Sequence, residues 1–428
     1  MTDPARLSLS EAARQIAEGS LTSEALVSAC LERIAAREPQ VGAWAYINPD
    51  HALAEARTRD SEKPRGPLHG VPVGLKDIID TTDMPTEYGS PIYKGFHPPS
   101  DAQCVTRLRA AGAVIMGKTV TAEFATYHPG KTANPLNLAH TPGGSSSGSA
   151  AAVADNHVPL TLGTQTAGSI IRPASFCGVI GYKPTYNAFG YHGLHPLAPS
   201  LDTLGIFVRS FADLSPVRRA LCIDPPKTSV IAPTDKSPRI GFCRTGLWER
   251  GDAAMRKALT STALRLAKAG ADVVEIELPP SFMDLVDAQT LIFAAEGLRG
   301  LANEWRDHRN QLSPELCELL EKAGSYTPDM EKAAHQLAAK CRAELAELTT
   351  EVDVLLTPGS VGEAPLGLEK TGDPLFNRIW TYLHVPCVTY PVGNGPNGLP
   401  LGAQVVGRHG DDDRLIAVAW WMQQHSRP

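Results

Sequence analysis

The chain has 428 residues, of which 43% are hydrophobic and 20% charged, a balance typical of a soluble globular protein with a sizeable core. Its formal net charge of −6 provides no basic face for a phosphate backbone, so the composition argues against a nucleic-acid-binding protein. The amino terminus "MTDPARLSLSEAARQIAEGS" lacks the charged and apolar regions of a secretory signal, and no run is long enough to cross a membrane. We therefore expect a cytoplasmic protein that neither spans nor binds a membrane.

The eight cysteines are scattered, with no CxxC pair and no histidine at zinc-finger spacing. This pattern argues against a disulfide framework and against structural zinc, and it favours buried, reduced thiols.

The amino-terminal forty residues predict two amphipathic helices that pack outside a sheet. Ser8 and Glu11 fit a capping box, and apolar residues then recur at helical spacing at Leu26, Cys30, Leu31 and Ile34. Next come "LHGVPVGLKDIID", a helical "AQCVTRLRAAG" and a strand-like "AVIMG". The low-charge, Gly/Ser/Pro-rich region from Gly117 to Gly205 contains apolar stretches such as "CGVIGYKP", so we expect it to be packed rather than disordered.

The carboxyl-terminal half follows the order of an α/β protein. A strand at Arg239–Phe242, a helix at Ala253–Lys268 and a strand at Val273–Glu277 are expected, and residues 281–350 should be mostly helical. Further strands are predicted at "VDVLLTP", "VPCVTYPVG" and "LGAQVVG", before a closing helix through "RLIAVAWWMQQ".

Two motifs match familiar catalytic patterns without the structural context that those patterns need. Gly112–Thr119, "GAVIMGKT", matches a Walker A loop, but a helix precedes it and its apolar middle predicts a buried strand. Gly144–Gly148, "GSSSG", matches a nucleophile elbow centred on Ser146, but the polar "NPLNLAHTP" precedes it in place of a strand. A triad of Ser146 with a histidine such as His384 or His409 stays an alternative at this point.

Lys76 and Ser169 are harder to explain by packing. Lys76 ends the apolar run "GVPVGLK", where burial would disfavour its charged form, although a lysine reaching to solvent from a strand end is the simpler interpretation. Ser169 follows an apolar strand in "GTQTAGSIIRPASF" and taken alone would be a turn residue.

Taken together, these segments resemble the amidase signature family of serine hydrolases. The matching motifs cover most of the chain: "LHGVPVGLKDIID", "GKTVTAEFA", "TPGGSSSGSAAAVA", "GTQTAGSIIRPASFCGVIGYKPT", "APSLDTLG" and "VPCVTYPVG" with "GLPLGAQVVG". The resemblance implies one α/β/α layered domain over residues 1–428, with a central mixed β-sheet and helices on both faces. Its signature core would lie at about residues 65–210 and 350–428, with a more variable helical region at about 281–350.

The resemblance also implies a Ser-cisSer-Lys triad. Carried across residue by residue, Ser169 is the nucleophile, Ser145 the bridging serine after a cis Gly144–Ser145 peptide, and Lys76 the base. Lys76 must then be neutral near pH 7, so its pKa should lie well below about 10.4. Backbone N–H groups of the loop Thr166, Ala167, Gly168 and Ser169 would form the oxyanion hole. This chemistry requires no metal and no organic cofactor.

Three positions depart from the family pattern. Gln165 and Ile171 stand where an aspartate and an arginine are common, and Arg172 follows one residue later. Losing both members of a charge pair is less disruptive than losing one. Ala167 replaces a frequent glycine, which is tolerable only if its φ is negative.

The expected substrate pocket is apolar. Aromatic residues and a leucine in or near family segments suggest an apolar pocket lined by Tyr127, Phe376, Trp380, Tyr382 and Leu383. The expected function is hydrolysis of small-molecule carbon–nitrogen bonds, in aryl amides or carbamates (urethanes), and of some esters. Two alternatives stay open: a glutaminase-like A subunit of a tRNA-dependent amidotransferase, whose "NLAG" segment corresponds here to "TYLH" at 381–384, and a non-catalytic binding protein. A homodimer is compatible with the sequence.

Overall fold

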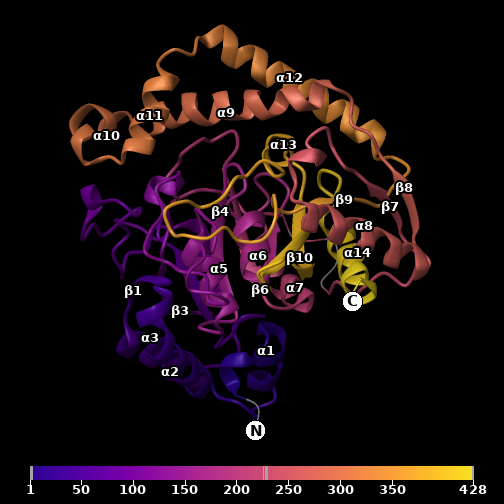
Figure 1. The fold of residues 1–428 in the computed structure, drawn as a ribbon. Coiled ribbons are helices and arrows are strands. Elements are labelled where there is room, and N and C mark those ends of the chain that lie inside the picture. The colour runs from indigo at the N-terminus through magenta and orange to yellow at the C-terminus, as the bar shows by residue number, and fades with distance from the viewer. Residues whose placement is uncertain (1–2, 225, 227–229, 427–428) are drawn as a thin grey trace.

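The computed structural model describes residues 3–224, 226 and 230–426, and Figure 1 shows its fold. The strands of these residues form one mixed, 11-stranded sheet in the order β1-β3-β2-β4-β6-β5-β10-β11-β9-β7-β8. β2 runs parallel to β3 and β4, and β7 runs parallel to β8 and β9, whereas the other neighbouring pairs are antiparallel. The strands are β1 (Trp44–Ile47), β2 (Pro72–Lys76), β3 (Val114–Thr119), β4 (Leu160–Gln165), β5 (Ile180–Lys183), β6 (Thr203–Val208), β7 (Arg239–Phe242), β8 (Asp272–Glu275), β9 (Val354–Pro358), β10 (Cys387–Asn394) and β11 (Pro400–Val406).

Helices cover both faces of this sheet, as expected for an α/β/α arrangement. Phe207 of β6 clusters with residues of α5 and α6, while its neighbours Ile206 and Val208 belong to the cluster that contains α7, α8 and α14. Successive side chains of a strand point to opposite faces, so these helices lie on opposite sides. The helices are α1 (Leu9–Ala17), α2 (Ser23–Val41), α3 (Pro49–Ser61), α4 (Gln103–Ala110), α5 (Ser147–Ala154), α6 (Ile171–Cys177), α7 (Leu214–Leu221), α8 (Ala253–Lys268), α9 (Ser281–Gly300), α10 (Ala302–Asp307), α11 (Pro314–Ala323), α12 (Pro328–Leu348), α13 (Arg378–Tyr382) and α14 (Asp412–His425).

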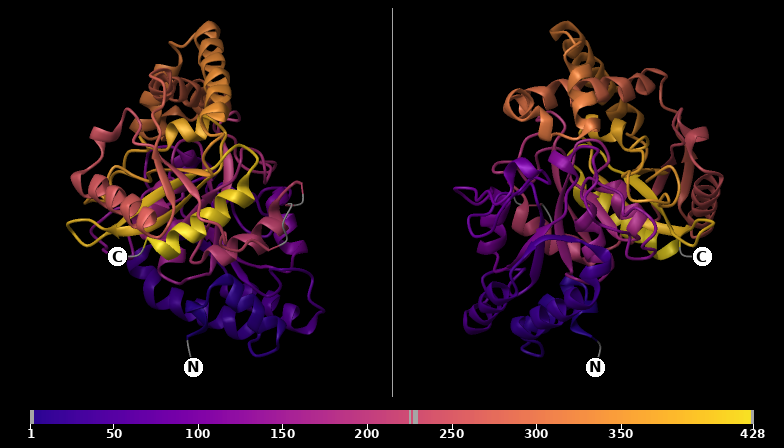
Figure 2. Two further views of the ribbon diagram at one scale, coloured as in Figure 1. Left: turned by 90° about the vertical axis from the view of Figure 1, so that its right-hand side faces the viewer. Right: turned by 60° about the vertical axis from the view of Figure 1, so that its left-hand side comes forward.

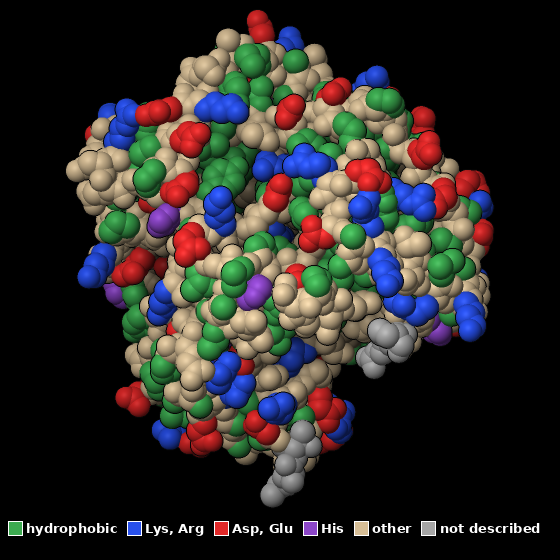
Figure 3. Space-filling model, viewed as in Figure 1, with side chains coloured by type: hydrophobic (Ala, Val, Ile, Leu, Met, Phe, Trp, Pro, Cys, Tyr) green, Lys and Arg blue, Asp and Glu red, His purple; other side chains and the backbone are tan. Residues whose placement is uncertain are grey.

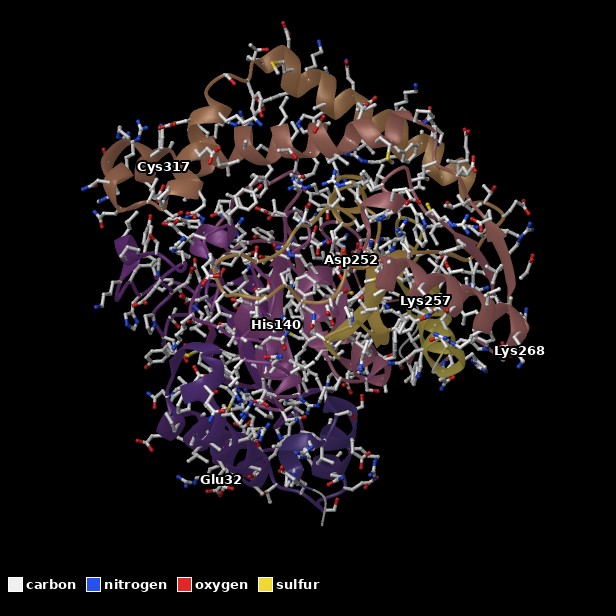
Figure 4. All side chains as sticks on the ribbon, viewed as in Figure 1. Glu32, His140, Asp252, Lys257, Lys268 and Cys317 are labelled. Carbon is white, nitrogen blue, oxygen red and sulfur yellow. The ribbon has the colours of Figure 1, made fainter. Side chains whose placement is uncertain are left out.

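The helices α9 to α12, residues 281–348, form a roof that runs across the top of the molecule as seen in Figures 1 and 2. The sequence predicted a mostly helical region here, and this prediction is confirmed. In Figure 4, Cys317 marks the roof at α11, and Glu32 marks α2 at the opposite end of the molecule. None of the described helices combines the length and the hydropathy that a membrane span requires.

Three local features of the fold match what the sequence predicts. Ser8 accepts a hydrogen bond from the backbone N–H of Glu11 at 3.2 Å and so caps α1. The Walker-like "GKT" lies in β3, which is buried along its whole length, so this segment is a strand and not a phosphate-binding loop. The region from Gly117 to Gly205 is packed, and it supplies β4, β5, β6, α5 and α6.

Asp155, at the end of α5, ties the amino-terminal helices to the body. Its carboxylate is 2.5 Å from Arg33 Nη2, 2.9 Å from Arg37 Nε and 3.2 Å from His157 Nε2. Asp155 is buried, and both arginines belong to α2. The ion pairs therefore hold α2 against the carboxyl end of α5.

We expect Asp155→Ala to lower the free energy of unfolding by about 2–3 kcal/mol, because it leaves two guanidinium groups without their partner in a largely buried setting. Equilibrium urea unfolding measures this change. The control is Glu24→Gln, which removes an exposed pair with Arg57 that lies 2.7 Å away, and it should cost less than about 0.5 kcal/mol. Equal losses in the two variants would contradict the prediction.

Candidate active site

Lys76 is the last residue of β2 and is fully buried in the sheet between β3 and β4. Its Nζ lies 2.8 Å from Ser145 Oγ and 2.8 Å from Thr164 Oγ1. Thr164 comes from β4, and Ser145 precedes α5. Within the described residues, both hydrogen-bond partners of this amine are neutral hydroxyls, and no carboxylate pairs with it directly.

Burial lowers the pKa of Lys76 to about 7, because the charged ammonium loses its hydration. The Asp202 carboxylate acts in the opposite direction, and the Arg172 guanidinium lowers the pKa further. Above pH 7 the amine is therefore mainly neutral and can accept a proton, as the sequence led us to expect.

The serine run is fixed to the sheet by its backbone and side chains. The Gly144–Ser145 peptide is cis, as expected. Ser146 Oγ donates to the carbonyl of Thr164 at 3.1 Å, and Ser147 Oγ donates to the carbonyl of Val120 at 3.3 Å. These two serines have structural partners, and no described histidine contacts Ser146, so the structure gives no support to the His-dependent triad.

The ring of His384 is engaged elsewhere. Its Nε2 lies 2.8 Å from the carbonyl of Ser200, and the ring stacks on Tyr186 at 4.1 Å.

The loop Thr166–Ser169 connects β4 to the start of α6. The backbone N–H groups of its four residues donate to no other part of the described chain. The next two N–H groups, of Ile170 and Ile171, both donate to Gln165 Oε1, at 2.9 and 3.1 Å. Ala167 is partly exposed and is not among the residues with positive φ, so the methyl group is tolerated. The loop thus presents a row of free donors that could stabilise an oxyanion.

Gln165 explains how the chain tolerates its departure from the family pattern. Its carboxamide accepts from the two isoleucine N–H groups, and its Nε2 donates to Thr381 Oγ1 at 2.9 Å. A neutral side chain therefore satisfies this buried position, and Ile171 places no charge beside it.

Arg172 does not pair with Gln165. Its guanidinium instead donates to the carbonyl of Gly144 at 2.6 Å and to the carbonyl of Thr371 at 2.8 Å. Through the first of these bonds, Arg172 links the helix that follows Ser169 to the peptide that precedes Ser145.

Ser169 is 7% exposed and lies two residues before the first residue of α6. Its hydroxyl makes no hydrogen bond with the described residues, Ser145 included. The structure therefore joins Lys76 to Ser145 directly, whereas it brings Ser169 to the same region through its loop and Arg172.

Asp202 is a residue of this site that sequence reasoning missed, although it lies in the family motif "APSLDTLG". One carboxylate oxygen accepts from Thr166 Oγ1 at 2.6 Å, and the other accepts from the N–H groups of Leu197 and Ala198 at 2.9 Å each. Burial raises its pKa to about 6, while these hydrogen bonds oppose the rise. Asp202 anchors the start of the loop and influences the charge of Lys76.

The predicted pocket residues lie mostly in the interior. Trp380, Tyr382, Leu383 and Phe376 are at most 2% exposed, and the Tyr382 hydroxyl lies 3.1 Å from His335 Nδ1. Tyr127 is partly exposed and packs against Phe293 of α9, with ring centroids 5.7 Å apart. Contact of these five residues with a substrate stays a prediction.

The segment that leads into α13 contains two charged residues and packs on the loop. A Cβ placed on Gly168 would come within 2.5 Å of Asn377 Oδ1 and 2.9 Å of Pro374 Cβ, so this segment packs directly on the loop. Asp373 and Arg378 flank these two residues in the sequence. Burial lowers the pKa of Arg172 to about 10, the Asp373 carboxylate raises it, and the Arg378 guanidinium lowers it. Acidic and basic side chains are also interspersed over the face shown in Figure 3.

The chain matches known proteins over nearly its whole length. A protein-family model described as "Amidase" matches residues 25–416. The chain is 34% identical over 472 residues to the A subunit of the glutamyl-tRNA(Gln) amidotransferase of Chloroflexus aggregans, covering 98% of this chain and 96% of that protein.

Two solved structures superpose on the chain over nearly its whole length. A peptide amidase from Stenotrophomonas maltophilia superposes with a TM-score of 0.86 at 30% identity, covering 99% of this chain and 97% of that one. A chain from "an unexpected vestigial protein complex", which "reveals the evolutionary origins of an s-triazine catabolic enzyme", gives a TM-score of 0.89 at 26% identity, with coverage of 98% and 99%. The chain therefore belongs to the amidase family and is an amidase-type enzyme.

Proposed function

We propose that the chain hydrolyses the carbon–nitrogen bond of a small amide through an acyl-enzyme on Ser169. The observation that carries the proposal is the buried Lys76 amine, 2.8 Å from Ser145 Oγ and with a pKa of about 7. A neutral amine in this position can take the Ser145 proton while Ser145 takes the proton of Ser169.

In the first step Ser169 Oγ attacks the amide carbon, and the negative charge develops on the carbonyl oxygen. The free N–H groups of Thr166–Ser169 would receive that oxygen. The proton held by Lys76 returns through Ser145 to the leaving amine as the carbon–nitrogen bond breaks. Water then attacks the acyl-enzyme and gives a proton to the relay formed by Ser145 and Lys76. The acid is released, and the proton returns to Ser169.

A charged substrate has more support than the aryl amide or carbamate expected from the sequence. Four of the five apolar candidates are buried in the core, whereas Arg378 and Asp373 flank the segment that packs on Gly168. A guanidinium and a carboxylate are the groups that a substrate with its own carboxylate and ammonium would need. We therefore propose a small amide with charged groups, and glutamine is one such compound.

The second candidate is the A subunit of a glutamyl-tRNA(Gln) amidotransferase. The identity to relatives of that name, 34% over nearly the whole chain, favours it. In this case the site would act as a glutaminase, and the chain would assemble with partner subunits. The alignment extends over 472 positions, more than the 428 residues of this chain, so that relative has residues without a counterpart here.

The proposed function predicts amide turnover that depends on Lys76 and Ser169. Glutamine, a short aliphatic amide, an aryl amide and an aryl carbamate should be offered at pH 8 to the wild type, Lys76→Ala and Ser169→Ala. We expect turnover of at least one amide and a loss of about 10³-fold in Lys76→Ala, because the relay loses its base. Labelling by a fluorophosphonate should stop in Ser169→Ala.

Substrate choice in the same panel separates the candidates. Preference for glutamine supports a charged substrate, whereas preference for the aryl compounds would support the apolar pocket that the sequence predicts. Wild-type turnover that survives in Lys76→Ala would exclude the relay.

The pH dependence follows from the Lys76 pKa of about 7. The neutral amine is the active form, so kcat/KM should rise with pH and level off above about pH 8. Well below pH 7 it should fall about tenfold per pH unit. Stopped assays of the preferred amide from pH 5.5 to 9 measure the profile, and a value that is flat from pH 6 to 8 would contradict the assignment of Lys76 as base.

A further inference from the structure

Two side chains from outside the loop hold its backbone carbonyls. Gln289 Nε2 donates to the carbonyl of Thr166 at 2.9 Å, and Thr381 Oγ1 donates to the carbonyl of Ala167 at 2.7 Å. Gln289 belongs to α9 in the roof, and Thr381 belongs to α13. Both side chains are fully buried, so water does not compete for these bonds.

The third carbonyl of the loop is held by the backbone. The N–H of Arg172 donates to the carbonyl of Gly168 at 3.0 Å. The carbonyls of Thr166, Ala167 and Gly168 therefore all have partners, while the N–H groups of the loop have none among the described residues.

Because a peptide bond is planar and trans, a carbonyl that is held in place also determines where the N–H group of the same peptide points. In such a peptide, the C=O of one residue and the N–H of the next point in opposite directions. Holding the carbonyls of Thr166 and Ala167 against α9 and α13 thus turns the N–H groups of Ala167 and Gly168 the other way. A peptide that flipped would lose its side-chain bond and would direct a carbonyl oxygen toward the oxyanion.

Further hydrogen bonds of Gln289 and Thr381 determine which of their atoms donates to the loop. Gln289 Oε1 accepts from Arg378 Nη1 at 3.2 Å, and an arginine can only donate, so the Gln289 amino group faces Thr166. Thr381 Oγ1 accepts from Gln165 Nε2 at 2.9 Å. Its single proton then serves the Ala167 carbonyl at 2.7 Å rather than the Asn377 carbonyl at 3.1 Å.

We infer that Gln289 and Thr381 are positioning residues that keep the oxyanion hole formed. The inference rests on the proposed function, since it concerns the loop that would stabilise the tetrahedral intermediate. Neither residue touches the relay of Lys76 and Ser145. Their loss should therefore reduce transition-state stabilisation without changing the base.

The test uses near-isosteric variants of the full chain and the preferred amide of the panel. Thr381→Val and Gln289→Met remove the two donors, and each should lower kcat by on the order of 10–100-fold. KM should change less than about threefold in Thr381→Val, whereas Gln289→Met also removes the acceptor of Arg378, so this variant is compared by kcat alone. Thr381→Ser keeps the hydroxyl and should restore most of kcat. The apparent pKa of kcat/KM should stay near 7 in all variants, because Lys76 keeps its partners.

A matched control is Thr262→Val on α8, which removes another buried threonine hydroxyl that donates to a helix carbonyl, that of Ala258, at 2.8 Å. This variant should keep the wild-type kcat. A fluorophosphonate probe gives a second measurement, since its labelling of Ser169 should slow in Thr381→Val and Gln289→Met but not in Thr262→Val.

The outcomes distinguish the positioning role from the proposed function. Wild-type kcat and labelling rates in both loop variants would overturn the positioning role and leave the proposed function standing. A drop in kcat that Thr381→Ser shares with Thr381→Val would also overturn the role of the Thr381 hydroxyl. A wild type that neither turns over an amide nor labels at Ser169 would overturn the proposed function, and the inference with it.

Discussion

The site depends on a primary amine buried at the end of a central strand. Lys76 has no exposed surface, and its hydrogen bonds go to the hydroxyls of Ser145 and Thr164. A buried ammonium that lacks a bonded carboxylate is costly, and the chain relieves that cost by favouring the neutral amine. The position of β2 between β3 and β4 enforces the burial, so the sheet itself sets the chemical state of the lysine.

A second lysine on the neighbouring strand shows that burial alone does not decide the role. Lys118 of β3 is as buried as Lys76, but its Nζ lies 3.1 Å from Asp77 Oδ1 and 2.6 Å from Thr86 Oγ1. Burial lowers the pKa of Lys118 as well, but the adjacent Asp77 carboxylate opposes that shift and pairs with the amine, so Lys118 ties β3 to the segment after β2. The same side chain therefore serves chemistry or stability according to its partner.

The loop after β4 is organised without a charged group at the position where the family commonly has one. Gln165 satisfies two N–H groups and orients Thr381, and Thr381 orients the Ala167 carbonyl. A neutral carboxamide can do both because it carries a donor and an acceptor, whereas a carboxylate only accepts. The loop is thereby connected to α13, and through Gln289 to the roof, by hydrogen bonds that add no buried charge.

The sequence by itself determined the class of fold, most strands and helices, and, through its resemblance to a family, the candidate residues Lys76, Ser145 and Ser169. These features follow from local periodicity and from contiguous motifs. Only the tertiary structure revealed Thr164 and Asp202 as neighbours of the lysine, and Gln289 and Thr381 as partners of the loop. Gln289 and Thr381 are 123 and 214 residues away along the chain from the carbonyls that they hold. It also showed that Trp380 and Tyr382 are buried. The sequence could not decide this, because an aromatic segment has the same pattern whether it lies at the surface or inside, and burial depends on how the helices pack on the sheet.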